Sequence, residues 1–331
     1  MGDVFAGLNS LSFEAGLTED EKELLYLRAR TAGLQYCGSA HAVFLCELVH
    51  TLRGMISRRT AKSPAGNDDL CVGILGMGRM GKKLLLFLLA KSGIRPSYIK
   101  VSTRRPESAE ELIHTEVECF FDNRRLASWA DILFLCCLPS HLPKVCADLH
   151  SNLSKSCLVY SFTSAVPCSR LSQLLGHDFI LKPQYDLVVC DTMDVWLSCS
   201  PLSDPLLIEL SCPLSMSGGI TLSPKWVCGL LYILLNICTA AGLGSSDALS
   251  LINSLLKKCP HTAELNVQSF ISEANAPCLP KEECFPWISL TNVQTKDTPL
   301  LAVLSSSNSI QPCISAAYKS LMKTAANTDT L

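Results

Sequence analysis

The 331-residue chain has few charged residues and almost no net charge. Asp, Glu, Lys and Arg make up 18% of it, and the formal net charge is −2. Such a chain has no general electrostatic affinity for nucleic acid or for an anionic membrane, so we expect neither as a partner. Hydrophobic residues reach 48%, which excludes a disordered chain and is typical of a well-buried globular protein. This length favours two domains.

The sequence also lacks the cysteine patterns of zinc proteins and disulfide scaffolds. It has 18 cysteines, but no Cys-x-x-Cys pair is matched by a second pair or by two histidines, so we predict no metal site. Most cysteines stand inside apolar runs, where a thiol acts as a small hydrophobic group. Reduced cysteines are typical of the cytoplasm, and we therefore predict a cytoplasmic protein.

No targeting segment is recognisable at the N-terminus. Residues 1–21 are acidic and hold no basic stretch followed by an apolar one, which argues against a signal peptide and an Arg-rich transit peptide. Residues 226–244 are apolar enough to resemble a membrane span, but Asn236 and Thr239 interrupt them and no basic cluster flanks them. We therefore expect a buried helix there, covered by a second subunit, and no membrane association.

A glycine-rich turn is the first motif that points to chemistry. Residues 71–89, "CVGILGMGRMGKKLLLFLL", carry the spacing G-x-G-x-x-G between an apolar strand and a helical pattern. There the first glycine permits a tight turn, the second lets the backbone approach a pyrophosphate, and the third lets helix and strand pack closely. The helix N-terminus supplies N–H groups and a positive dipole for the phosphates. We predict a dinucleotide site at Gly76, Met77, Gly78, Arg79, Met80 and Gly81; the alternative is a glycine-rich turn that binds nothing.

The end of the next predicted strand indicates which dinucleotide is expected. NAD sites usually carry Asp or Glu there to accept from the ribose 2′-hydroxyl. This chain reads "VSTRRP" over 101–106, with hydroxyls and guanidiniums that suit a 2′-phosphate and no carboxylate to repel it. We therefore predict NADP, bound by Ser102, Thr103, Arg104 and Arg105. In the alternative interpretation the two arginines belong to a solvated loop.

From about residue 68 to 182, short apolar runs alternate with helical patterns. The runs are apolar on both faces, which is typical of a parallel sheet with helices on each side. Strands are expected at 70–76, 97–105, 117–121, 131–139, 157–162 and 178–182. Helices are expected at 79–93, 106–115, 141–153 and 167–177, with a connection at 123–130. This pattern predicts an α/β fold with a doubly wound parallel sheet, a Rossmann domain.

The regions on either side of this pattern are mostly helical. Thr18 and Glu21 fit a capping box, and apolar residues at helical spacing follow. We expect a first helix over 22–53, a loop over 54–69, outer strands at 186–199 and 206–212, and later helices at 225–242, 245–258 and 309–324. We divide the chain into an N-terminal helical extension with linker (1–66), the Rossmann domain (67–215) and a mostly helical dimerisation and substrate domain (216–331).

These motifs resemble those of a known family. Residues 72–112, "VGILGMGRMGKKLLLFLLAKSGIRPSYIKVSTRRPESAEEL", and 130–145, "ADILFLCCLPSHLPKV", are similar to the N-terminal domain of the pyrroline-5-carboxylate reductases. The whole is most similar to their divergent relatives, the NADP-dependent oxidoreductase domain-containing proteins. The resemblance implies NADP, a homodimer, and an active site between the Rossmann domain and the helical domain. It also implies that Leu138 and Pro139 lie beside the nicotinamide ribose.

The departures from the reductases concentrate in the substrate half. They usually read Lys-Pro-Gln after the fourth strand, where this chain has "LPS" at 138–140, and their later Ser-Pro-Gly-Gly-Thr-Thr motif is absent. We therefore expect an NADP-dependent oxidoreductase that transfers a hydride between NADPH and a small imine or carbonyl compound, with the substrate left open. The alternatives are a non-catalytic NADP-binding sensor or interaction protein, and a structural protein that binds no nucleotide.

Hydride transfer also needs a group that donates or removes a proton at the partner heteroatom. Lys225, at the start of a predicted helix, and His141, after the fourth strand, are the catalytic residues we predict. Lys182 and Tyr185 come next. For each of them an ordinary surface role is the alternative.

Overall fold

The computed structural model describes residues 16, 18–60, 69–108, 115–188, 192–197, 204–256, 264–272, 280–306 and 310–324. Its centre is a six-stranded, all-parallel sheet with the order β3-β2-β1-β4-β5-β6. The strands are β1 Val72–Leu75, β2 Ile99–Ser102, β3 Glu118–Phe120, β4 Ile132–Leu135, β5 Leu158–Ser161 and β6 Ile180–Leu181. This is the order of a doubly wound Rossmann sheet, and it confirms the predicted fold class.

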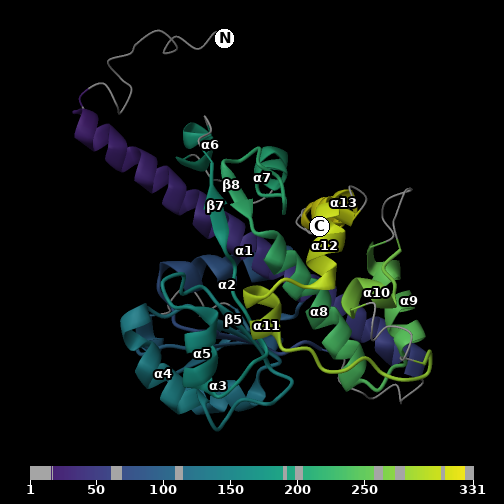
Figure 1. Ribbon diagram of the computed structural model, residues 1–331. Helices are drawn as coiled ribbons and strands as arrows, with labels where there is room; N and C mark the ends of the chain where they lie inside the picture. The colour runs from purple at the N-terminus through teal and green to yellow at the C-terminus, as the bar shows by residue number, and fades with distance from the viewer. Residues whose placement is uncertain are drawn as a thin grey trace.

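One face of the sheet is covered by helices that each follow a strand in sequence. These are α3 Asn123–Trp129, α4 Leu142–Leu149 and α5 Cys168–Leu175 (Figure 1). Alternate strand residues such as Leu133, Leu135 and Val159 point toward them and form one buried cluster. The prediction of a plain connection over 123–130 is wrong, because Asp122 accepts a hydrogen bond from the N–H of Arg125 at 2.9 Å and caps a short helix.

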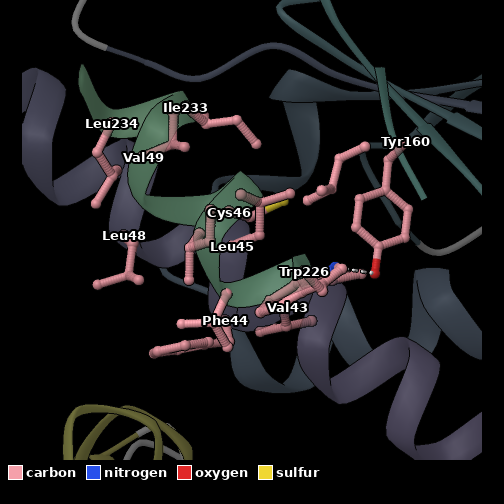
Figure 2. Close-up of a cluster of buried hydrophobic side chains, with 14 of the residues drawn as sticks. Val43, Phe44, Leu45, Cys46, Leu48, Val49, Tyr160, Trp226, Ile233 and Leu234 are labelled. Carbon is pink, nitrogen blue, oxygen red and sulfur yellow. Dashed lines mark hydrogen bonds between the residues drawn. The ribbon is translucent and has the colours of Figure 1, made fainter. Parts of the chain in front are cut away.

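The other face is covered by helices drawn from distant parts of the chain. They are α1 Glu19–Thr60, α2 Arg79–Lys91 and α8 Pro224–Ala240. Figure 2 shows side chains of α1 and α8 gathered in one buried cluster, which Tyr160 of β5 joins. There the indole N–H of Trp226 donates to the Tyr160 hydroxyl at 3.2 Å. The helical extension is therefore part of the main hydrophobic core.

Helix α1 begins as its capping box predicts. The N–H of Thr18 donates to a carboxylate oxygen of Glu21 at 2.8 Å, and the N–H of Glu21 donates back to the Thr18 hydroxyl at 3.3 Å. The first turns project from the body of the protein (Figure 1), and Leu24 and Leu27 are exposed there. The loop predicted from residue 54 is wrong over its first seven residues, because the helix continues to Thr60.

Two predicted outer strands are corrected. Only Tyr185–Leu187 forms a strand, β7, which pairs antiparallel with β8 Ile220–Leu222. The segment 193–197 is helix α6, Met193–Leu197, while residues 189–191 and 198–199 lie outside the described residues. The segment 206–212 is mostly helix α7, Pro205–Leu210, because Asp204 accepts from the N–H of Leu206 at 2.8 Å and proline starts the first turn.

The C-terminal region is helical, as predicted. It contains α9 Ser245–Leu256, α10 Val267–Phe270, α11 Leu290–Thr295, α12 Pro299–Ser306 and α13 Ile310–Thr324. Short 3-10 turns are η2 Pro96–Tyr98, η3 Pro106–Ser108 and η5 Pro139–His141. Of the helix expected at 106–115, η3 is the described beginning, and residues 109–114 lie outside the described residues.

Helix α8 finds its burial within one chain. Twelve of its 17 residues are buried, with α1, α9, α11 and α12 packed against it. Its apolar surface therefore does not by itself require a second subunit, although the homodimer stays a prediction. Within the part of the chain that is described, none of the helices has the length and hydropathy that a membrane span requires.

Candidate functional site

The glycine turn joins β1 to α2 at the switch point of the sheet. Gly76 has a φ of +101°, which suits glycine alone, and its N–H donates to the carbonyl of Ser102 at 2.9 Å. A Cβ on Gly81 would lie 2.0 Å from the carbonyl oxygen of Gly76. A Cβ on Gly78 would meet no described heavy atom within 4 Å beyond its chain neighbours. The first and third glycines thus close the turn, and the second leaves open space.

The open space lies at the N-terminus of α2. Gly78 is the residue that caps this helix, and it has no side chain to accept from the first-turn N–H groups. Arg79, the first residue of the helix, is exposed and adds a positive charge to the helix dipole. A helix end of this kind attracts an anionic group such as a pyrophosphate.

The end of β4 forms the neighbouring side of this edge. The N–H of Cys136 donates to the carbonyl of Leu75 at 2.9 Å, which holds the ends of β1 and β4 together. Leu138 follows with its side chain 64% exposed, and Pro139 starts the η5 turn. The structure thus places the two predicted ribose neighbours at the same sheet edge as the glycine turn.

The end of β2 presents its arginines but not its serine. Arg104 and Arg105 are exposed, and the half-buried Thr103 precedes them. Ser102 is buried, and its hydroxyl donates to the side-chain oxygen of Asn123 at 2.9 Å. That hydroxyl proton is therefore used within the protein, so the geometry leaves Thr103 and the two arginines as the groups that face outward at this position.

Helix α1 reaches the glycine turn, which the sequence does not indicate. A Cβ on Gly38 would lie 3.5 Å from the terminal carbon of Met80 and 3.2 Å from the ring of Phe162. Phe162 comes directly after β5. A small residue at position 38 therefore lets α1 approach both the turn and the end of β5.

The two predicted catalytic residues lie on separate elements. Lys225 is the second residue of α8, and its N–H donates to the capping hydroxyl of Ser223 at 3.3 Å. Its ammonium lies 3.7 Å from a carboxylate oxygen of Asp297, which is almost fully exposed. His141 is half-buried at the end of η5.

Lys182 has more hydrogen-bond partners than Lys225. Its ammonium donates to the carbonyls of Ser164 at 2.6 Å and Val166 at 2.5 Å, in the loop between β5 and α5. Its backbone N–H donates to the side-chain oxygen of Gln294 at 2.9 Å, and the amide of Gln294 donates to Ile180 O at 2.7 Å. Partial burial lowers the pKa of Lys182. This lysine connects β6, α11 and the loop after β5.

A buried histidine on α1 escaped the sequence prediction. The Nε2 atom of His41 lies 2.8 Å from the carbonyl oxygen of Ser211, and Nδ1 lies 2.9 Å from the Tyr185 hydroxyl. A carbonyl only accepts, so Nε2 carries the hydrogen and Nδ1 accepts from Tyr185. Burial lowers the pKa of His41 to about 4, so the ring is neutral. Tyr185, a lesser catalytic candidate, is thus engaged in the core; a histidine inside the apolar stretch 36–49 was the available signal.

These features define a Rossmann-type α/β protein with a glycine turn of dinucleotide-binding geometry. Residues 71–164 match the family described as NADP oxidoreductase coenzyme F420-dependent. The mouse NADP-dependent oxidoreductase domain-containing protein 1 is 39% identical over 342 residues, covering 96% of this chain and 92% of the relative. The chain belongs to this family of oxidoreductase domain-containing proteins.

Two reductases are also similar to this chain. Pyrroline-5-carboxylate reductase of Escherichia coli is 33% identical over 109 residues, which is 32% of this chain and 40% of that protein. A solved pyrroline-5-carboxylate reductase from Coxiella burnetii covers 78% of this chain and 98% of its own, at 16% identity and a TM-score of 0.33. The resemblance to these reductases found in the sequence is confirmed.

Proposed function

We propose that this protein is an NADP-dependent oxidoreductase that transfers a hydride between NADPH and a small imine or carbonyl compound. The glycine turn is the observation that supports this proposal. Gly76 and Gly81 allow the tight turn, and the space beside Gly78 is free of described atoms. This space lies at the N-terminus of α2, which attracts an anionic group. The name of the mouse relative supports NADP as the cofactor.

The preference for the phosphorylated cofactor rests on the end of β2. Arg104 and Arg105 are exposed beside Thr103, and the stretch from Ser102 to Arg105 contains no carboxylate. A guanidinium binds a phosphate through two parallel N–H donors, and a carboxylate at this position would repel the same phosphate. A 2′-phosphate therefore gains contacts here that a 2′-hydroxyl does not.

When bound, the nicotinamide supplies or accepts the hydride, and the protein must manage the proton. We propose Lys225 for this role, because it is the second residue of α8 and its side chain stays 32% exposed beside Asp297. His141, on the turn after β4, is the second choice. A homodimer and a cytoplasmic location complete the proposal.

The cofactor site is tested by two matched glycine substitutions. Gly78→Val places two methyl groups where the pyrophosphate is expected, and so it should abolish NADPH binding in a fluorescence titration while the protein stays folded. Gly54→Val on α1 is the control, because a Cβ there also meets no described atom within 4 Å. Unchanged NADPH affinity in folded Gly78→Val would contradict the proposed site.

Catalysis is tested separately, by screening cyclic imines, keto acids and aldehydes for NADPH oxidation. With a substrate in hand, Lys225→Met should lower the turnover rate by about 10²–10⁴ and leave NADPH affinity unchanged. If the variant keeps full turnover, His141 becomes the residue to test. Tight NADPH binding with no turnover in the screen would favour the non-catalytic NADP-binding alternative.

A further inference from the structure

A pocket lies at the amino-terminal edge of the sheet, opposite the glycine turn. Its volume is about 500 Å³, and its floor consists of residues that come just before four of the strands: Cys71, Asp131, Ser156 and Phe179. Four-residue strands separate this edge from the proposed cofactor site, a distance of roughly 13 Å at about 3.3 Å per residue. Nothing in the proposed reaction uses this pocket.

Two helices and an aromatic side chain build its walls. Residues at positions i, i+3 and i+4 of each helix face the pocket, which is the spacing of one helix face. They are Arg53, Ile56 and Ser57 of α1, Ile237 and Ala240 of α8, and Ala241, the residue that caps the end of α8. Trp287 closes one side; its ring centroid lies 5.0 Å from that of Phe179, and it is 39% exposed. An apolar group placed here would cover this indole.

The lining also contains a fixed pair of opposite charges. The two terminal nitrogens of Arg53 donate to the two carboxylate oxygens of Asp131 at 2.7 and 2.8 Å. The N–H of Cys71 also donates to Asp131, at 3.0 Å, and so anchors the carboxylate to the sheet. The side chains of Arg53 and Asp131 remain 33% and 32% exposed. Asp69, which is ion-paired with Arg95, adds a second carboxylate to the lining.

We propose that this pocket binds a small zwitterion, an α-amino acid with an apolar side chain. Its carboxylate would take the guanidinium N–H groups of Arg53 that Asp131 leaves available, and its ammonium would lie against Asp131 and Asp69. Its side chain would cover Ile237 and Trp287. A simple anion would meet two carboxylates here, and a simple cation would meet the guanidinium, whereas a zwitterion matches both charges.

The charge requirement is tested by calorimetric titration of the full chain with L-phenylalanine and two derivatives. N-acetyl-L-phenylalanine lacks the ammonium, and L-phenylalaninamide lacks the carboxylate. We expect L-phenylalanine to bind and each derivative to bind at least about tenfold more weakly, since each loses a charge-assisted contact. Absence of binding by L-phenylalanine, or equal binding by a derivative, would overturn the proposal.

The location is tested by filling the pocket from an exposed position. Ala241→Phe should remove amino-acid binding, whereas Ala302→Phe, on an exposed position of α12 outside the pocket, should keep it. Ala240→Phe repeats the test from the adjacent lining position if the first variant melts early. NADPH affinity should stay unchanged in all three variants, which separates this pocket from the cofactor site. Retained amino-acid binding in folded Ala241→Phe or Ala240→Phe would place the ligand elsewhere.

Discussion

The two faces of the central sheet are both buried, but they are covered by different parts of the chain. On one face, α3, α4 and α5 each lie next to their strand in sequence. On the other face, α2 is joined by α1, which precedes every strand, and by α8, which follows all six. The glycine turn opens into α2, so the proposed cofactor site belongs to the face that depends on both ends of the chain. Gly38 of α1 makes this dependence direct, because it lies against Met80.

The largest expected loss of stability comes from a cavity on the sheet face that α1, α2 and α8 cover. Trp226 is 1% exposed and donates to Tyr160, so Trp226→Ala creates a cavity and leaves a buried hydroxyl without its donor. We expect the free energy of unfolding to fall by about 3–5 kcal/mol. Urea denaturation measures this loss, and NADPH titration of the folded variant should show weaker binding.

Leu149→Ala provides the matched cavity on the locally closed face. Leu149 is fully buried on α4, and its truncation should cost about 2–5 kcal/mol of unfolding free energy. Its NADPH affinity should nevertheless stay close to that of the unaltered protein. Leu149 belongs to the core that α4 forms with α3 and α5, and no residue of α1 is part of that core. If both cavities weakened NADPH binding equally, the proposed difference between the faces would be wrong.

The next effect concerns the loop after β5, which Lys182 holds by two hydrogen bonds. Lys182→Met removes both donors, and hydrogen bonds from a charged group are worth about 1.5–3 kcal/mol. We expect kcat/KM to fall by about tenfold or more. The melting temperature should fall less than it does in Trp226→Ala. Lys182→Arg should recover part of the activity, since a guanidinium also donates to two carbonyls. A fall in stability without a fall in kcat/KM would assign this lysine to the fold alone.

A further effect is the pH dependence of stability that His41 gives to the core around α1. Its folded pKa of about 4 lies below the ordinary value of 6.5, so the unfolded chain takes up a proton first as the pH falls. The free energy of unfolding should therefore decrease from about pH 6.5 to pH 4, by at most about 1.4 kcal/mol per pH unit. His41→Gln should flatten this region of the profile in urea denaturation at several pH values.

His177 is the control for that profile, because burial lowers its pKa as well and it lies on the locally closed side, where it bonds to the carbonyl of Cys157 at 2.8 Å. His177→Gln should leave the larger part of the acid sensitivity in place. An unchanged profile in His41→Gln would show that the histidine is not the source.

The smallest effect is expected at the exposed end of β2. Arg104→Ala together with Arg105→Ala should weaken NADPH binding by about tenfold and leave NADH binding unchanged, since only the first cofactor carries the 2′-phosphate. Arg124→Ala, on the exposed surface of α3, is the control for loss of positive charge. Equal affinities for NADPH and NADH in the unaltered protein would contradict the assignment. Raising the salt concentration should shrink the difference.

The strands, the glycine turn and the helices near both ends of the chain were predictable because each is a local pattern. Apolar runs, glycine spacing and capping residues such as Thr18 act within a few neighbours along the chain. The prediction failed at 206–212 and 123–130, where Asp204 and Asp122 cap short helices. The first stretch is mostly apolar and the second mostly polar, and neither shows a clear helical periodicity. A capping residue stabilises a short helix only when the residues that follow it are also buried, and the sequence does not show which residues are buried.

The sequence by itself thus determined the α/β class, the six strands of the parallel sheet with most of the helices between them, and the residues of the glycine turn. Only the tertiary structure decided that α1 covers the sheet, that the Ser102 hydroxyl is taken by Asn123, and that His41 is neutral between Tyr185 and Ser211. The physical reason is distance along the chain. Periodicity and turn chemistry depend on adjacent residues, whereas burial, hydrogen-bond partners and pKa depend on contacts between residues that here lie 21 to 170 positions apart.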